Sequence, residues 1–198
     1  MADSVVSRRR AKGCSGPRCS SDERRTCDFF VVPTATFRVL HVFVVLSHAR
    51  RRILHVNVTA CPTAEWVARQ LVEAFPGTKP IPRFLIHDGD GSYGWEFRRA
   101  LKMLGIEPMR TAPKSPWQNC YVERVTGTLR RECTDHVIAF GERHLRRVLT
   151  EYVAYYNESR PHQSLDGNAP VPRRVEPVGE IIATPVLGGL HHRYSRAA

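Results

Sequence analysis

The sequence predicts an α/β fold with a mixed five-stranded sheet flanked by helices. Three runs rich in β-branched and aromatic residues follow one another within residues 28–59, separated only by short turn segments. Beyond them, segments with helical spacing alternate with short apolar runs, which is typical of strands joined by crossover helices. The expected order is βββαβαβα plus a C-terminal helix.

The first half of the chain supplies four of the five strands. The initial runs are DFFVV, FRVLHVFVVL and RRRILHVNVT, and the breaks PTAT and SHAR predict hairpin connections between them. Residues 61–75 then change to helical spacing, with a Pro-Thr start and a Pro-Gly stop. The run RFLIH is apolar at nearly every position, as expected of a strand covered on both faces.

The second half is predicted to be mainly helical. Residues 95–105, WEFRRALKMLG, have apolar side chains at helical spacing and end in a glycine typical of a C-cap, after which IEPMRT can form the fifth strand. A long helix is expected to begin near Trp117, and a final helix covers residues 142–157. Gly188 and Gly189 predict the turn of a small C-terminal hairpin.

Three regions are therefore expected along the chain. Residues 1–25 are basic and lack apolar periodicity of either kind, which predicts a disordered arm. Residues 26–160 contain the sheet and its helices as one core domain. Residues 161–198 form a C-terminal tail that includes the hairpin.

The charge balance indicates a polyanionic partner. The 198 residues contain 30 Lys and Arg against 19 Asp and Glu, which leaves a formal net charge of +11. Nucleic acid is the commonest such partner, although excess charge also serves solubility alone. The six cysteines show no zinc-site spacing, and we find no secretory signal and no apolar run of membrane length. We expect a cytoplasmic, nucleoid-associated protein with no membrane partner.

Three acidic residues are predicted to meet at one edge of the sheet. Asp28 opens the first strand, Asp88 directly follows the fourth, and Glu123 lies on the polar side of the first turns of the long helix. Carboxylates are the ligands that Mg²⁺ and Mn²⁺ prefer, and a bound cation would offset the repulsion among them. In the segment DGDGSY, Asp90 is either a turn residue or the alternative ligand to Asp88.

Four stretches resemble the DDE integrase core of insertion-sequence transposases and retroviral integrases, a family with a ribonuclease H-like fold. They are CDFFVV, FLIHDGDGSYGWEF, APKSPWQNCYVERVTGTLRREC and YNESRPHQSLDG, which together cover roughly residues 26–170. Asp88 and Glu123 are 35 positions apart, the separation typical of the second and third acids in this family. Relatives that read D-N-G-S-x-F after the strand use the first acid as ligand, which favours Asp88 over Asp90.

The resemblance implies phosphoryl transfer on DNA. Hydrolysis at an element end would free a 3′-hydroxyl, which then attacks a target phosphodiester in line. Two Mg²⁺ or Mn²⁺ ions are implied, with Asp28 shared by both, Asp88 on one and Glu123 on the other. The implied partners are the element ends and a target duplex, and synapsis of paired ends implies at least a dimer.

Weaker candidates lie around Glu123 and after the last helix. Residues that are candidates for contact with DNA phosphates are Lys114, Gln118, Asn119 and Arg130, although an exposed polar face explains each of them equally well. His162 is a candidate acid or base, but a capping or packing role together with Arg160 is the preferred interpretation.

One feature usual in the family is not found in this sequence. Such transposases generally carry a helix-turn-helix region ahead of the core, whereas residues 1–27 contain no apolar pattern able to form one. We therefore expect a truncated copy, or a core whose recognition part comes from another chain. Two alternatives stay open: a non-catalytic DNA-binding remnant of a transposase, and a ribonuclease H-like nuclease acting on RNA or hybrid duplexes.

Overall fold

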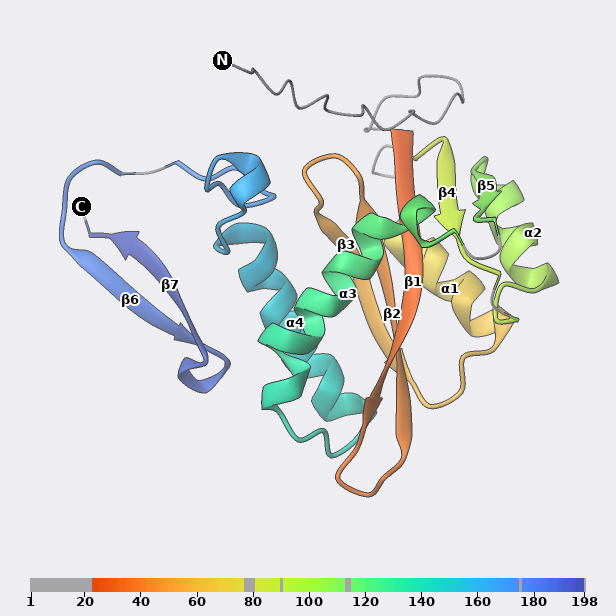
Figure 1. The fold of residues 1–198 in the computed structure, drawn as a ribbon, viewed down its shortest axis with the longest axis horizontal. Coiled ribbons are helices and arrows are strands. Elements are labelled where there is room, and N and C mark those ends of the chain that lie inside the picture. Colours follow the sequence, from red (N-terminus) through yellow and green to blue (C-terminus); the bar gives the residue numbers. More distant parts are fainter. Residues whose placement is uncertain (1–22, 77–80, 90, 113–114, 175, 198) are drawn as a thin grey trace, which may run out of the picture.

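A five-stranded mixed sheet is the centre of the fold. The computed structural model describes residues 23–76, 81–89, 91–112, 115–174 and 176–197. The strands are β1 (Arg24–Pro33), β2 (Val39–Ser47), β3 (Ile53–Thr59), β4 (Phe84–His87) and β5 (Glu107–Arg110), and they lie in the order β3-β2-β1-β4-β5. The first three are antiparallel neighbours, whereas β4 and β5 run parallel to β1, so the predicted mixed sheet is confirmed (Figure 1).

Four helices cover the two faces of this sheet. They are α1 (Ala64–Ala74), α2 (Trp95–Leu104), α3 (Cys120–Glu132) and α4 (Glu142–Glu158). The Thr63 side chain accepts a hydrogen bond from the Trp66 backbone at 3.2 Å and caps the start of α1. Gly105, with a φ of 70°, ends α2 in the left-handed conformation that the C-cap requires. The predicted element order is confirmed.

Each face of the sheet has its own apolar core, because alternate strand residues point to opposite sides. On one side, Phe30, Val42 and Val44 pack with residues of α3 and α4. On the other, Phe43 and Val45 pack with residues of α1 and α2. The sheet therefore forms the middle layer between two layers of helices (Figure 1).

The first strand begins earlier than the sequence indicates. Residues 24–26 pair with residues 84–86 of β4, and Arg25 also pairs with Ser47 of β2. The placement of residues 24 and 25 in a disordered arm is therefore wrong, because β2 and β4 pair with the backbone whatever side chains it carries. The rest of that predicted arm, up to residue 22, lies outside the described residues.

A separate two-stranded sheet lies near the C-terminus, where the sequence predicts a hairpin. It consists of β6 (Ile181–Val186) and β7 (His191–Arg196), joined by a 3₁₀ turn at Leu187–Gly189. The Leu187 backbone donates a hydrogen bond to the Glu151 carboxylate at 2.6 Å. The turn end of this hairpin is thus attached to α4.

Arg160 and His162 have packing roles, as the preferred interpretation predicts. The Arg160 guanidinium donates to both carboxylate oxygens of Glu132, at 2.7 and 2.5 Å, and Tyr152 donates to the same carboxylate at 2.7 Å. Burial acts to raise the pKa of Glu132, but these hydrogen bonds outweigh it and hold that pKa below its ordinary value. His162 is buried with its ring edge-on to Tyr156.

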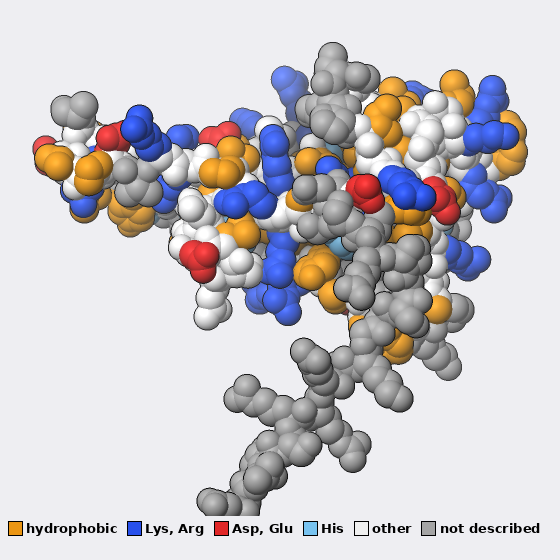
Figure 2. Space-filling model, turned by 90° about the horizontal axis from the view of Figure 1, so that it is seen from above, with side chains coloured by type: hydrophobic (Ala, Val, Ile, Leu, Met, Phe, Trp, Pro, Cys, Tyr) orange, Lys and Arg blue, Asp and Glu red, His pale blue; other side chains and the backbone are white. Residues whose placement is uncertain are grey.

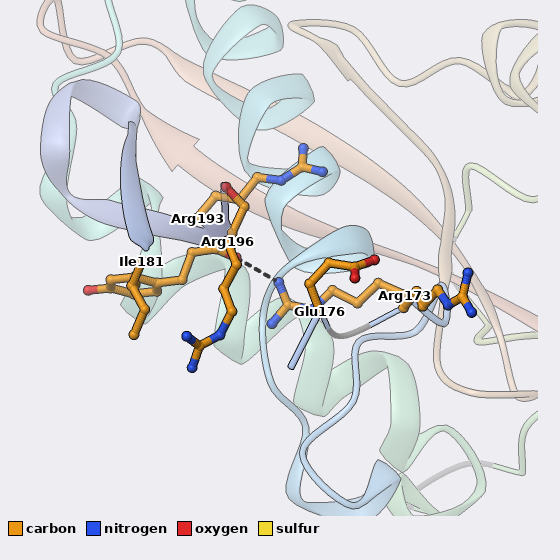
Figure 3. Close-up of a pocket in the computed structure, with 8 residues that line it drawn as sticks. Arg173, Glu176, Ile181, Arg193 and Arg196 are labelled. Carbon is orange, nitrogen blue, oxygen red and sulfur yellow. Dashed lines mark hydrogen bonds between the residues drawn. The ribbon is translucent and has the colours of Figure 1, made fainter. Parts of the chain in front are cut away.

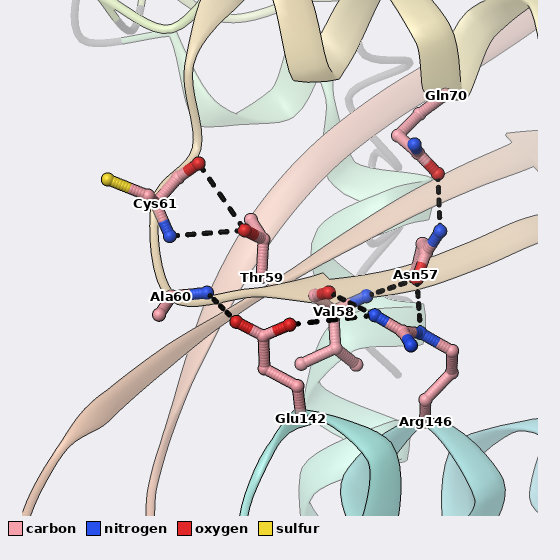
Figure 4. Close-up of polar contacts among 8 residues, drawn as sticks. All are labelled: Asn57, Val58, Thr59, Ala60, Cys61, Gln70, Glu142 and Arg146. Atoms are coloured by element: carbon pink, nitrogen blue, oxygen red, sulfur yellow. Dashed lines mark hydrogen bonds and ion pairs between the residues drawn. The ribbon is translucent and has the colours of Figure 1, made fainter.

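A polar network links the edge strand β3 to helices on both faces (Figure 4). Asn57 donates a hydrogen bond to Gln70 of α1 at 2.6 Å and accepts one from Arg146 of α4 at 2.7 Å. Arg146 also donates to the Val58 carbonyl at 2.9 Å. One asparagine therefore fixes α1 and α4 relative to the same strand.

The described residues contain no helix that is both long and apolar enough to cross a bilayer. The described cysteines, Cys27, Cys61, Cys120 and Cys133, all have free thiols.

The half-buried histidine after β2 predicts a pH-dependent stability. Burial lowers the pKa of His48 to about 4, and the charges of Arg24 and Arg25 act in the same direction. The folded protein holds this ring neutral against Tyr121, so the unfolded chain binds one more proton between about pH 4 and 6.5. We expect the free energy of unfolding to fall as the pH is lowered through that window.

Urea unfolding at a series of pH values measures this effect. Between pH 7 and pH 4, the free energy of unfolding of His48→Gln should fall by less than that of the parent, the difference being of the order of 2 kcal/mol. Burial also lowers the pKa values of His87 and His162. These two histidines should make the stability of the variant fall somewhat as the pH is lowered, in the same direction as in the parent. His136→Gln, at an exposed histidine, is the matched control and should reproduce the parent curve. Parallel curves for parent and His48→Gln would refute the assignment.

Candidate active site

Two of the three predicted acids lie on neighbouring strands, Asp28 within β1 and Asp88 directly after β4. β1 and β4 run parallel, with Thr26 opposite Ile86. Asp28 and Asp88 each follow two positions later along their strands, so the same register brings them to one level. Both side chains are half-buried.

Electrostatics support the proximity of these two carboxylates. Cys27 and Tyr93 are buried beneath them, and the thiol contacts the phenol oxygen at 3.9 Å. Burial is the main reason that the pKa of Cys27 and the pKa of Tyr93 both rise, and the charges of Asp28 and Asp88 raise each of them further. The two aspartates therefore act on one small region, above an apolar floor.

The position of Asp88 depends on its immediate neighbours. The His87 ring packs against Tyr93 and Phe97, at 5.0 Å between centroids in each case, and its Nδ1 lies 2.7 Å from the Asp88 carbonyl oxygen. On the other side, the Arg110 guanidinium lies so close to Gly89 that a Cβ there would be 2.6 Å from Nη2. Glycine at position 89 thus admits a positive group next to Asp88.

A buried hydrogen bond holds the start of α3 over β1. The Thr26 hydroxyl donates to the Asn119 side-chain oxygen, and both residues are buried. Asn119 is 6% exposed, so the exposed polar face offered as the alternative explanation does not apply to it, and its predicted contact with DNA phosphates stays a prediction. Asn119 occupies the N-cap position, and its side chain anchors the helix to the strand.

This anchor brings Glu123 to the level of Asp28. Glu123 is one turn beyond Asn119, about 6 Å along the helix, and Asp28 is two residues beyond Thr26, about 7 Å along the strand. Further along the same helix, the Arg130 guanidinium lies 5.5 Å from the Phe30 ring centroid, so α3 follows β1 in the same direction.

The Glu123 side chain is exposed, whereas both aspartates are half-buried. Among the residues described, no three His, Cys, Asp or Glu side chains are grouped closely enough to hold a metal ion. The register places Asp28 and Asp88 at one level, and the joint metal site of the three acids stays a prediction. The available donors are carboxylate oxygens, which fit a hard divalent cation.

The remaining predicted site residues have varied surroundings. The Gln118 side-chain oxygen accepts a hydrogen bond from the Ala112 backbone at 2.7 Å, which holds the loop before α3. Arg130 is exposed along α3. Lys114 and Asp90 lie outside the described residues, so their predicted roles stay predictions.

Sequence reasoning did not identify the residues that support the acids. Thr26 carries one available signal, because it precedes Asp28 by two positions and therefore shares its face of the strand. His87 and Tyr93 read as ordinary strand and turn residues in the sequence. Their contacts with Asp88 and Cys27 depend on the packing of α2, which no local pattern shows.

Comparisons with known proteins relate the chain to integrases and transposases. Residues 104–170 match the family described as integrase core domain. The chain is 27% identical over 144 residues to the putative transposase InsK of insertion element IS150 from Escherichia coli K12, covering 69% of this chain and 49% of that protein. It is 28% identical over 169 residues to an uncharacterized 39.2 kDa protein of insertion element IS476 from Xanthomonas euvesicatoria, covering 81% and 48%. The chain thus spans about half the length of these curated relatives.

Similar solved structures come from retroviral integrases. One is the HTLV-2 integrase catalytic core domain in complex with magnesium, in a trimeric form, with a TM-score of 0.61 and 11% identity over 75% of this chain and 93% of that one. Another is the simian T-cell lymphotropic virus intasome in complex with the PP2A regulatory subunit B56 gamma, with a TM-score of 0.61 and 15% identity over 89% and 67%.

The fold is accordingly the ribonuclease H-like fold of integrase catalytic cores. Within that class, residues 104–170 match the integrase core family, and the chain is similar to insertion-sequence transposases.

The contact between Thr26 and Asn119 predicts a measurable role in placing α3. Thr26→Val removes the donor and leaves the Asn119 oxygen buried without it, which should lower the free energy of unfolding by about 1–3 kcal/mol. Amide hydrogen exchange in the first turn of α3 should accelerate more than exchange in α4. Thr26→Ser keeps the hydroxyl and is the matched control. Unchanged exchange at the start of α3 in Thr26→Val would show that this contact does not position the helix.

Proposed function

We propose that this chain catalyses metal-dependent cleavage of DNA strands and their transfer to a target duplex. The supporting observation is the register that places Asp28, within β1, level with Asp88, directly after β4, together with the anchoring of the start of α3 to β1. Glu123 on that turn is the proposed third acid. The relationship to insertion-element transposases supports DNA as the substrate.

Each acid has a distinct task in this proposal. Asp28, Asp88 and Glu123 would hold two Mg²⁺ or Mn²⁺ ions, which supply activation of the attacking water or 3′-hydroxyl and stabilisation of the leaving 3′-oxygen. Asp28 lies between the other two and is the shared ligand. The half-buried setting of the aspartates strengthens their interaction with a cation, because less water competes.

In this proposal, a movement of the Glu123 side chain completes the metal site. Its side chain is exposed on the first turn of α3, so it can reorient without disturbing the core. The backbone beneath it is fixed through Asn119, which limits that movement to the side chain. We propose that Glu123 turns toward Asp28 when DNA and the metal ions bind.

The exposed position of Glu123 also favours a second candidate function. A chain in which the third acid does not join the site would bind DNA through its basic surface and catalyse nothing. Figure 2 shows Lys and Arg side chains over the core and the hairpin end, with few acidic side chains on that face. Such a remnant would keep the fold and the DNA affinity.

Nicking of supercoiled plasmid in Mg²⁺ or Mn²⁺ distinguishes these functions. The parent protein should nick the plasmid. The nicking rate should fall by more than about 100-fold in each of Asp28→Asn, Asp88→Asn and Glu123→Gln. Changes to residues that only support metal ligands typically cost ~10–100-fold. Glu107→Gln is the matched control. It removes an exposed carboxylate of β5 that pairs with Phe84, at the end of β4 away from Asp88.

The outcomes separate the candidates. Loss in the three acid variants with activity retained in Glu107→Gln supports the DDE transferase. Equal DNA binding by all proteins with no nicking by any of them supports the remnant. Cleavage of an RNA/DNA hybrid in preference to DNA duplex would replace the proposal with a ribonuclease H-like nuclease.

We further propose that the active form contains at least two copies of the chain, as synapsis of two element ends requires. The trimeric form named for the HTLV-2 catalytic core and the intasome of the simian virus support an oligomer.

A further inference from the structure

A second concentration of positive charge lies away from the three acids, beside the C-terminal hairpin. A cavity of about 320 Å³ opens where the segment before β6 passes β7 (Figure 3). Its lining combines four arginines with one glutamate, a tyrosine and two other side chains: Arg173, Arg174, Glu176, Ile181, Arg193, Tyr194, Ser195 and Arg196. The proposed catalytic chemistry uses none of these residues.

The cavity is built on a fixed platform. The His191 ring stacks on Tyr155 of α4 with 4.7 Å between centroids, and its Nε2 lies 2.7 Å from the Glu132 carbonyl oxygen. Arg193 forms an ion pair with Glu158 at 3.6 Å. These contacts fix β7 against α4, so the side chains that line the cavity are displayed by a braced hairpin.

Two of the arginines connect the walls of the cavity. The Arg173 guanidinium donates to the Tyr194 carbonyl at 3.3 Å, and that of Arg196 donates to the Gly179 carbonyl at 2.8 Å. Each guanidinium has five N–H donors, so one contact with a carbonyl leaves others for an anion. The four positive charges of the lining outnumber the single negative charge of Glu176, which makes the cavity suited to phosphate groups.

Tyr194 adds a flat apolar surface to this charge. Its side chain is 58% exposed on β7, which also carries Arg193 and Arg196. Aromatic rings within a basic groove are the usual means of binding single strands, because bases stack on the rings while phosphates meet the cations. A duplex keeps its bases stacked inside and offers no base face to a single tyrosine.

We propose that this cavity binds single-stranded DNA, with phosphates on Arg174 and Arg193 and a base stacked on Tyr194. Its volume lies at the lower end of the range of ligand pockets and suits about one nucleotide at a time. The inference rests on the proposed function only in taking DNA as the nucleic acid. It adds a strand-holding site apart from the acids.

Fluorescence anisotropy with a labelled oligothymidylate tests this site, using full-length Glu123→Gln protein so that no cleavage interferes. Tyr194→Ala should weaken binding by roughly 5-fold or more, as loss of one base stack predicts. Tyr194→Phe keeps the ring and should bind like the parent. Arg174→Ala should weaken binding and reduce the slope of log affinity against log salt by about 0.7, the value for one phosphate of a single strand.

Arg69→Ala is the control for loss of charge in general. Arg69 lies on α1, on the opposite face of the sheet from α4, and pairs with Glu65. Equal affinity of Tyr194→Ala and Tyr194→Phe would overturn the proposal, as would equal effects of Arg174→Ala and Arg69→Ala. Asp28→Asn should bind the oligothymidylate like the parent, so a failure of the catalytic proposal and a failure of this one give different results.

Discussion

The double pairing of β1 is the constraint on which the rest of the structure depends. This strand is hydrogen-bonded along one side to antiparallel β2 and along the other to parallel β4. A strand in that position can neither slip nor twist independently, since a shift of one residue would exchange its two faces. The level of Asp28 relative to Asp88 is therefore set by the backbone, before any side chain contributes.

Successive side chains of β1 point to opposite faces of the sheet, so the two faces of this strand have different roles. Thr26, Asp28 and Phe30 share the face toward α3, where the hydroxyl of Thr26 and the ring of Phe30 contact the helix at two points. Cys27 points to the opposite core and forms part of the floor under the aspartates. A single strand thus positions a carboxylate, anchors a helix and closes the apolar side of the site.

The sequence predicted the elements well because their apolar spacing is strong, as in α4, whose inward positions Leu145, Leu149 and Tyr152 are all buried. It failed for the start of β1, because Arg24 and Arg25 belong to the sheet through backbone pairing that leaves no mark in the side chains. It did not show the role of Asn119 in the fold, because the Thr26 hydroxyl that bonds to its side chain lies on a distant strand. The contact joins residues 93 positions apart, and no local pattern carries it.

The exposed position of Glu123 follows from the electrostatics of clustered carboxylates. A third carboxylate beside Asp28 and Asp88 adds repulsion, which is strongest where burial reduces screening. On the first turn of α3, by contrast, a negative side chain interacts favourably with the positive end of the helix dipole and with water. The chain therefore keeps two acids in fixed register on strands and the third on an anchored but exposed helical turn. An added positive charge between them would make convergence of all three favourable, because it would offset their mutual repulsion.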